Sequence, residues 1–225
     1  MKKHVVNTAD DIELAPGKTI RDWKALRVKL TTGNDPDDWE EAFDKYFRGR
    51  LKARYFDPIK VLEKSPKLQG EGFSIVTIQC SLIEFLESTY QGKSFTTKRP
   101  KQGQVLPGDK YCDSGGIFTD FLTLRPPFEQ HFKNKLVAPN KTLARDFYEC
   151  VRCGLMHEAR TKDTWVIRVD KGGNGPPVQI KQTEKIIYRN NFQEGLREFI
   201  KWYKGELTKP ARQQAFISKF DSLCQ

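Results

Sequence analysis

Arg152 and His157 are the residues whose types and spacing point most directly to chemistry. An arginine is always charged and forked, so it can stabilise the extra negative charge of a phosphorane. A histidine has a pKa near neutrality and can move protons there. Together they could carry out metal-independent cleavage of RNA, although their types and spacing alone fit a surface arginine and a semi-exposed histidine better. In that reaction the 2′-hydroxyl attacks the adjacent phosphate, leaving a 2′,3′-cyclic phosphate (or its hydrolysed form) and a 5′-hydroxyl, and no cofactor is expected.

The pair lies in residues 139–162, which predict the strongest helix of the chain. Apolar residues at every fourth position form its core-facing stripe: Leu143, Phe147, Val151 and Leu155. Arg152 and His157 fall on opposite flanks of this stripe, about 140° apart. One chain is therefore not expected to bring both side chains to one phosphate, whereas two copies related by symmetry could.

Further residues are candidates for supporting roles. Gly154 costs about 1 kcal/mol relative to alanine inside a helix, and it removes bulk beside Cys153, so a partner helix or a phosphate could approach closely there. Glu84 lies in the narrow polar stripe of the preceding apolar segment, where it could orient the arginine or the histidine, or face water. Glu158 adjoins the histidine, and Arg160 could contact RNA or be solvated.

Arg152, four intervening residues and His157 resemble the signature of the HEPN family (higher eukaryotes and prokaryotes nucleotide-binding), many members of which are metal-independent RNases. The resemblance covers about residues 72–162, where the signature follows an almost wholly apolar helix. Cys153 departs from the family pattern, because Asn, Asp or His often follows the arginine in active members.

The resemblance implies a helical bundle that forms a homodimer through the Arg152–His157 helix, so that two copies pool their arginines and histidines. It also implies a metal-independent endoribonuclease in a toxin–antitoxin, phage-defence (antiviral) or stress-response setting, with an antitoxin or regulatory partner. One alternative keeps the fold without catalysis, as an RNA- or protein-binding module. Another is a zinc site at Cys150, Cys153 and His157. Its fourth ligand would come from His131, His4, Cys80, Cys112 or Cys224.

The charge of the chain favours a polyanionic partner such as RNA. The chain has 39 Lys and Arg against 29 Asp and Glu, a net charge of +10, and its pI is near 9.3. Many soluble proteins are basic without binding nucleic acid, so the charge alone leaves both possibilities open. Residues 92–110 form a basic loop that is either a solvated connection or a contact for RNA. The cations of this loop that could contact RNA are Lys93, Lys98, Arg99 and Lys101.

The periodicity of the remaining segments predicts a mainly α fold, a helical bundle with a small inserted β-hairpin at about 164–188. Asp35 and Pro36 begin a helix, and Asp57 with Pro58 signals a second, short one. Residues 73–91 have so little polar surface that they belong at the centre of the bundle. Residues 1–70 are expected to be an extension with one amphipathic helix, packed on a bundle of residues 71–225.

The remaining composition indicates a cytoplasmic protein. The five cysteines are odd in number and are expected to be reduced thiols. No apolar run approaches the ~18 residues that a membrane span needs. The first residues carry charge but lack the apolar core of a secretory signal.

Overall fold

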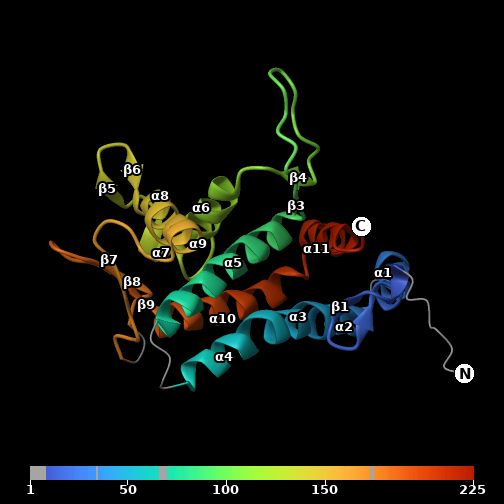
Figure 1. Ribbon diagram of the computed structural model, residues 1–225. Helices are drawn as coiled ribbons and strands as arrows, with labels where there is room; N and C mark the ends of the chain where they lie inside the picture. The colour runs from blue at the N-terminus through green and yellow to red at the C-terminus, as the bar shows by residue number, and fades with distance from the viewer. Residues whose placement is uncertain (1–8, 34, 66–69, 173–174) are drawn as a thin grey trace, which may run out of the picture.

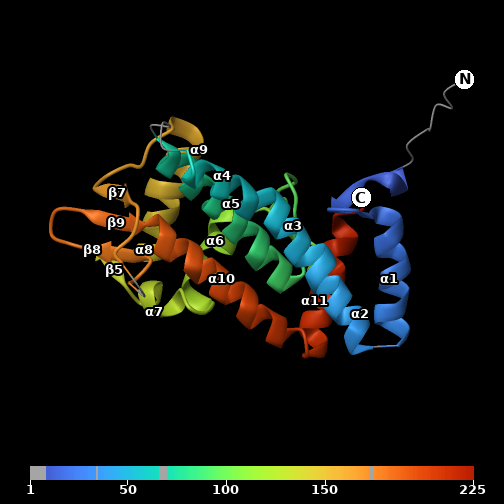
Figure 2. The same ribbon diagram turned by 90° about the horizontal axis from the view of Figure 1, so that it is seen from below.

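The computed structural model describes residues 9–33, 35–65, 70–172 and 175–225. It is about 60% helical with a few small sheets, which confirms the predicted mainly α fold. In Figures 1 and 2 the long helices lie side by side, and most of the strands gather at one end of the bundle. Within the described residues, the helices are too short or too polar to cross a lipid bilayer.

The N-terminal part begins with η1 (Ala9–Asp11), β1 (Glu13–Ala15), β2 (Lys18–Thr19) and α1 (Ile20–Thr32). Thr19 and Asp22 form a reciprocal capping box that starts α1, each side chain accepting a hydrogen bond from the other residue's backbone N–H. This capping begins a helix that runs from Ile20 to Thr32. Its buried face comprises Ile20, Trp23, Leu26 and Leu30.

A single helix spans residues 36–63 next, and we call it the long helix. Its consecutive parts are α2 (Pro36–Glu41), η2 (Ala42–Arg48), α3 (Gly49–Leu51), η3 (Lys52–Phe56) and α4 (Asp57–Glu63). Asp35 caps it as predicted, accepting a hydrogen bond from the N–H of Asp37 at 3.0 Å. The short helix expected from Asp57 and Pro58 is α4, but it continues η3 without a break instead of standing apart. The wider π-helical turn of η3 comes just before Pro58, which lacks an N–H, and the helix continues through it.

The centre of the bundle is α5 (Glu71–Gln91), as the apolar segment predicts. It packs against α4, α6 (Ser114–Leu124), α10 (Arg189–Glu206) and α11 (Pro210–Ser222). Figures 1 and 2 both show α5 lying between the long helix and the elements around α6. Because neighbours cover most of its circumference, a polar side chain on α5 has to find a partner inside the fold.

The described part of residues 1–70 shares its core with the end of the chain. Trp23 packs on Phe220 with ring centroids 5.0 Å apart, and Phe47 packs on Tyr203 at 5.4 Å. These rings belong to the same apolar cluster as the centre of α5. The long helix and α1 are therefore integral to the bundle rather than attached to its surface.

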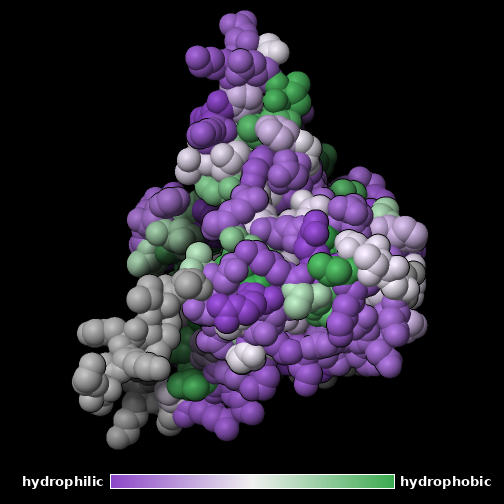
Figure 3. Space-filling model, turned by 90° about the vertical axis from the view of Figure 1, so that its right-hand side faces the viewer, coloured by the Kyte–Doolittle hydropathy of each residue, from purple (hydrophilic) through white to green (hydrophobic). Residues whose placement is uncertain are grey.

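Between α5 and α6 the chain leaves the body of the molecule. The short strands β3 (Ser94–Phe95) and β4 (Lys110–Tyr111) pair in parallel and hold the base of a loop, residues 96–109, which we call the arm. Figures 1 and 3 show the arm projecting from the body, with a surface that is mostly hydrophilic and hydrophobic in places. Val105 on the arm is 93% exposed.

The helix that carries the predicted pair is shorter than residues 139–162. Helix α7 (Glu129–Phe132) and the hairpin β5 (Leu136–Ala138) and β6 (Lys141–Thr142) precede it, and it consists of α8 (Leu143–Phe147), η4 (Tyr148–Arg152) and α9 (Cys153–Glu158). Thr142 caps its start, and Ala159 ends it in the left-handed conformation at φ 53°. The predicted apolar stripe is buried along its whole length.

The inserted β element has one strand more than a hairpin. The strands are β7 (Trp165–Arg168), β8 (Val178–Ile180) and β9 (Lys185–Tyr188), in the order β7-β9-β8. Strands β8 and β9 form the hairpin, and β7 pairs with β9 in parallel. The sheet is tied to α8 by the buried carboxylate of Asp146, which accepts hydrogen bonds from Trp165 at 2.8 Å and Lys185 at 2.7 Å.

Candidate functional site

Arg152 reaches from η4 to the central helix. Its Nη2 lies 3.2 Å from Oε2 of Glu84 on α5, and both side chains are largely buried, with exposures of 20% and 17%. The guanidinium also lies 5.5 Å from the ring centroid of Tyr148. Of the two partners considered for Glu84, the structure places Arg152 against it. Burial alone would lower the pKa of Arg152, but the negative charge of Glu84 raises it, and the guanidinium stays charged.

Tyr111 and Lys219 interact with Glu84, and Arg50 interacts with Lys219, so we call Glu84, Arg152, Tyr111, Lys219 and Arg50 the Glu84 cluster. Burial raises the pKa of the Tyr111 hydroxyl, which also feels the nearby carboxylate of Glu84. Burial, together with the charge of Arg50, lowers the pKa of Lys219 to about 8, while Glu84 opposes that shift. Burial likewise lowers the pKa of Arg50 to about 10. The cluster thus combines three cations with one carboxylate in a partly dry environment.

Sequence reasoning missed these additional members because they come from distant parts of the chain. Arg50 belongs to α3 and donates a hydrogen bond to the carbonyl of Leu14 at 2.6 Å. Lys219 did carry a readable signal. It lies three residues after Phe216 and directly before Phe220, both fully buried, so a lysine occupies the apolar face of α11. Lysine is rarely buried to this degree, so its place on this face is a signal that the sequence carries.

His157 lies elsewhere on the same helix. Its side chain is exposed, and among the described residues it forms neither a hydrogen bond nor an ion pair with Arg152. Five residues of α-helix place the two side chains about 140° apart around the axis. Within one chain the arginine therefore points into the Glu84 cluster while the imidazole faces solvent.

Gly154 has a different use from the one that the sequence suggests. A Cβ atom at this position would lie 2.5 Å from the carbonyl oxygen of Arg160 and 3.3 Å from Cγ of Lys162. The chain turns back at Ala159, and the N–H of Lys162 donates to the carbonyl of Cys150 at 2.8 Å. The expectation that a partner helix or a phosphate approaches Gly154 is wrong, because the chain's own return segment fills that space.

Glu158 and Arg160 lie away from the Glu84 cluster. Glu158 pairs with Lys162 at 2.5 Å and with Arg160 at 3.4 Å, and the side chain of Arg160 is 69% exposed. These contacts stabilise the turn after α9 and leave Arg160 accessible to a ligand near His157.

The two cysteines of this helix differ in environment. Cys150 is buried, and its Sγ lies 3.5 Å from Oδ1 of Asp146, while Cys153 is half-buried beside Tyr148. Among the described residues no group of three or more His, Cys, Asp or Glu side chains is placed to hold a metal ion. The zinc alternative at Cys150, Cys153 and His157 thus gains no support, and its possible ligand His4 lies outside the described residues.

The cations of the basic loop divide between the base of the arm and the arm itself. Lys93 is half-buried, and its carbonyl accepts a hydrogen bond from Nζ of Lys219 at 3.1 Å. Lys98, Arg99 and Lys101 are exposed on the arm. The hydrogen bond from Lys219 fixes the base of the arm next to the Glu84 cluster.

Comparison with known proteins gives no relative from which the function of this site could be inferred. No protein-family model matches the chain, and no curated protein and no solved structure matches it either. What the site can do is therefore argued from its own charges and contacts. It offers a partly buried, oriented guanidinium, surplus positive charge and a solvent-facing imidazole on one helix.

Proposed function

We propose that the protein is a metal-independent endoribonuclease in which Arg152 stabilises the phosphorane and His157 is the general acid or base. The observation that carries the proposal is the 3.2 Å pair between Arg152 and Glu84, with the guanidinium largely buried yet 20% exposed. A guanidinium held in place costs little reorganisation when charge develops on a phosphate, and partial burial strengthens its field.

The charge balance of the Glu84 cluster supports an anionic ligand. Glu84 is the one carboxylate of the cluster. It interacts with Arg152 and Lys219, and Arg50 lies near Lys219. A phosphate that reached the exposed edge of Arg152 would meet a surplus of positive charge, while Glu84 holds the fork of the arginine in one orientation.

The proposed reaction balances without a metal or cofactor. The 2′-oxygen of RNA attacks phosphorus as the imidazole of His157 takes the 2′-hydroxyl proton. The bond from phosphorus to the 5′-oxygen breaks, and a protonated imidazole returns a proton to that oxygen. The products are a 2′,3′-cyclic phosphate and a 5′-hydroxyl.

The angle between Arg152 and His157 supports a site shared by two chains. Because the two side chains lie about 140° apart on the helix, the arginine of one copy and the histidine of the other would act on one phosphate. Met156, next to His157, is 52% exposed and offers apolar contact area for such a dimer. The HEPN resemblance adds a cytoplasmic toxin, phage-defence or stress setting, with an antitoxin or regulatory partner, to the proposal.

The test is RNA cleavage by purified protein in excess EDTA, with the product ends mapped. We expect cyclic-phosphate ends from the wild type, and a loss of at least about a hundredfold in Arg152→Ala and His157→Ala. Arg168→Ala is the matched control, since Arg168 pairs with Glu184 at 2.8 Å but lies on β7. If all three variants cleave equally, another site or a contaminant is responsible, and the proposal fails.

A mixing experiment tests the shared site. Arg152→Ala and His157→Ala proteins, unfolded together and refolded, would form mixed dimers with one intact site, which restores about a quarter of wild-type activity. No recovery from mixtures shown to contain mixed dimers would refute the shared site. A folded wild type that binds RNA and releases no new ends would instead establish the non-catalytic binding module.

A further inference from the structure

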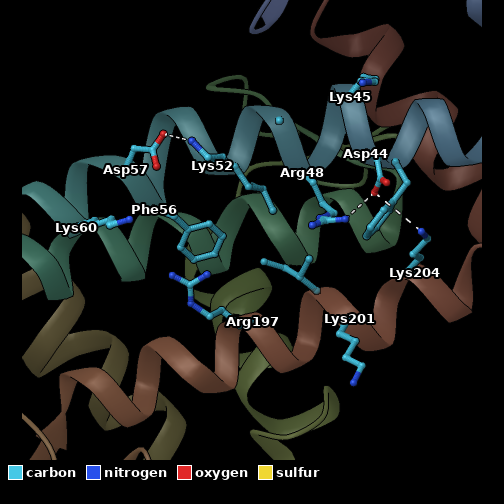
Figure 4. A pocket seen from close by; sticks show the side chains of 14 residues that line it. Asp44, Lys45, Arg48, Lys52, Phe56, Asp57, Lys60, Arg197, Lys201 and Lys204 are labelled. Atoms are coloured by element: carbon cyan, nitrogen blue, oxygen red, sulfur yellow. Dashed lines mark hydrogen bonds and ion pairs between the residues drawn. The ribbon is translucent and has the colours of Figure 1, made fainter.

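A groove of about 750 Å³ lies between the long helix and α10, outside the Glu84 cluster. Its floor is apolar and comes from both walls, with buried side chains of Phe43, Leu51 and Ile200. Figure 4 shows charged side chains along both helices around this floor. None of the residues that suggest catalysis from the sequence line this groove, so its composition needs a separate explanation.

The lining of the groove is strongly basic. Seven of its residues are Lys or Arg and two are Asp, a surplus of five positive charges within a protein of net charge +10. Both carboxylates are already engaged, since Asp44 pairs with Arg48 at 2.9 Å and Asp57 with Lys52 at 2.6 Å. Other lining cations form no ion pair within the described part of the chain, namely Lys45, Lys60 and Lys201.

The cations of the groove are spread along the two helices rather than gathered at one point. On the long helix, Lys45 and Lys60 are fifteen residues apart, which corresponds to about 22 Å along the axis. On α10, Arg197, Lys201 and Lys204 lie one turn apart and span seven residues, about 10 Å along the axis. Cations spread along both helices over these lengths fit a chain of phosphates better than a single phosphate group.

The groove also offers a surface for stacking. The guanidinium of Arg197 lies 4.5 Å from the ring centroid of Phe56, and Figure 4 shows the two side chains facing each other across the groove. Nucleic-acid bases stack on aromatic rings and on guanidinium planes, and such stacking tolerates any sequence. A polyanion without bases, such as polyphosphate, would use the cations, Arg197 included, but would not stack on the ring of Phe56.

We propose that the groove between the long helix and α10 binds single-stranded RNA, with phosphates along the cations of both helices and a base against Phe56 and Arg197. The inference rests on the proposed function only in naming RNA as the polyanion. It assigns the groove to holding the strand, separately from the Arg152 site.

Binding is measured by fluorescence anisotropy with a labelled single-stranded 2′-O-methyl RNA of about a dozen nucleotides. The 2′-O-methyl groups block cleavage, so binding is read independently of catalysis. The variant Lys45→Ala/Lys60→Ala/Lys201→Ala is expected to bind at least tenfold more weakly. In a plot of the logarithm of the affinity against the logarithm of the salt concentration, the slope of this variant should be smaller in magnitude by about 2, because three phosphate contacts are lost.

The matched control removes three exposed lysines elsewhere, Lys133→Ala/Lys135→Ala/Lys171→Ala, which have no ion pair in the described chain. It should change the affinity less than threefold. Equal losses of RNA affinity in both triple variants would show that RNA is attracted diffusely to a basic protein, and the proposal of a binding groove would be wrong. Repeating the measurements in an Arg152→Ala background distinguishes a failure of the proposed RNA binding in the groove from a failure of the catalytic proposal.

Phe56→Leu tests the base contact. Leucine keeps the side chain apolar but removes the ring, so RNA binding should weaken about fivefold while competition by inorganic polyphosphate stays unchanged. If Phe56→Leu leaves RNA binding unchanged, or weakens polyphosphate equally, the groove is a general polyanion site and the assignment to RNA is wrong.

Discussion

The Glu84 cluster and the groove both gather cations, but they do so in opposite environments. In the cluster, Arg152 is 20% exposed and held by one carboxylate at 3.2 Å. In the groove, Lys52 pairs with Asp57 at 2.6 Å, yet the two side chains are 71% and 47% exposed. Water screens the second pair and not the first. The comparison suggests that few, fixed cations suit a step with developing charge, whereas many exposed cations suit binding of a strand.

The largest expected difference concerns catalysis. Arg152→Ala should lower kcat by at least about a hundredfold, because an oriented charge at the phosphorane is lost. Lys201→Ala in the groove should raise KM about two- to threefold and leave kcat unchanged, since it removes one phosphate contact. Steady-state kinetics on a defined RNA separates the two parameters. A kcat effect from Lys201→Ala as large as that of Arg152→Ala would erase the distinction between the regions.

The next effect concerns stability and its pH dependence at Lys219. Burial lowers its pKa to about 8 in the folded protein, so between pH 8 and about 10.5 the unfolded chain binds more protons, and wild-type stability rises with pH. Lys219→Met should raise the free energy of unfolding at pH 7 by about 2 kcal/mol and abolish that rise. Urea denaturation at several pH values measures both. A destabilised Met variant would mean that the ammonium makes net favourable contacts.

A smaller effect is expected from removing one carboxylate of each region. Glu84→Gln leaves Arg152 partly buried without its counter-charge and should lower the free energy of unfolding by about 1–2 kcal/mol. Asp57→Asn in the groove should change it by less than about 0.5 kcal/mol, because the pair with Lys52 is exposed. Comparable losses in the two variants would show that burial does not set the strength of these pairs.

The smallest expected effect is that of a chelator. Excess EDTA should leave both the cleavage rate and the thermal midpoint unchanged, since neither region relies on a metal in the proposals made above. A chelator-induced loss of stability that added zinc restores would favour the alternative through Cys150, Cys153 and His157, and Cys150→Ala would then have to abolish the restoration.

Predictions from local pattern succeeded where one element carries the whole signal. The stripe from Leu143 to Leu155 is buried as its spacing of four predicts, and the apolar segment 73–91 is the central helix. Predictions failed where a residue outside the element determines the surroundings of a side chain. Gly154 appears open to a partner in the sequence, but Arg160 folds back onto it because Ala159 reverses the chain.

The pattern of residues along the chain is enough to predict the mainly α character, the position of Arg152 and His157 on one helix, and their separation around its axis. These follow from periodicity and helix geometry, which are local properties of the chain. Only the packing of the folded chain shows that Glu84 pairs with Arg152, that Lys219 lies near Glu84, and that the long helix and α10 line one groove with their cations. Such contacts join residues far apart in the chain, and packing of the shared apolar core determines which of them meet.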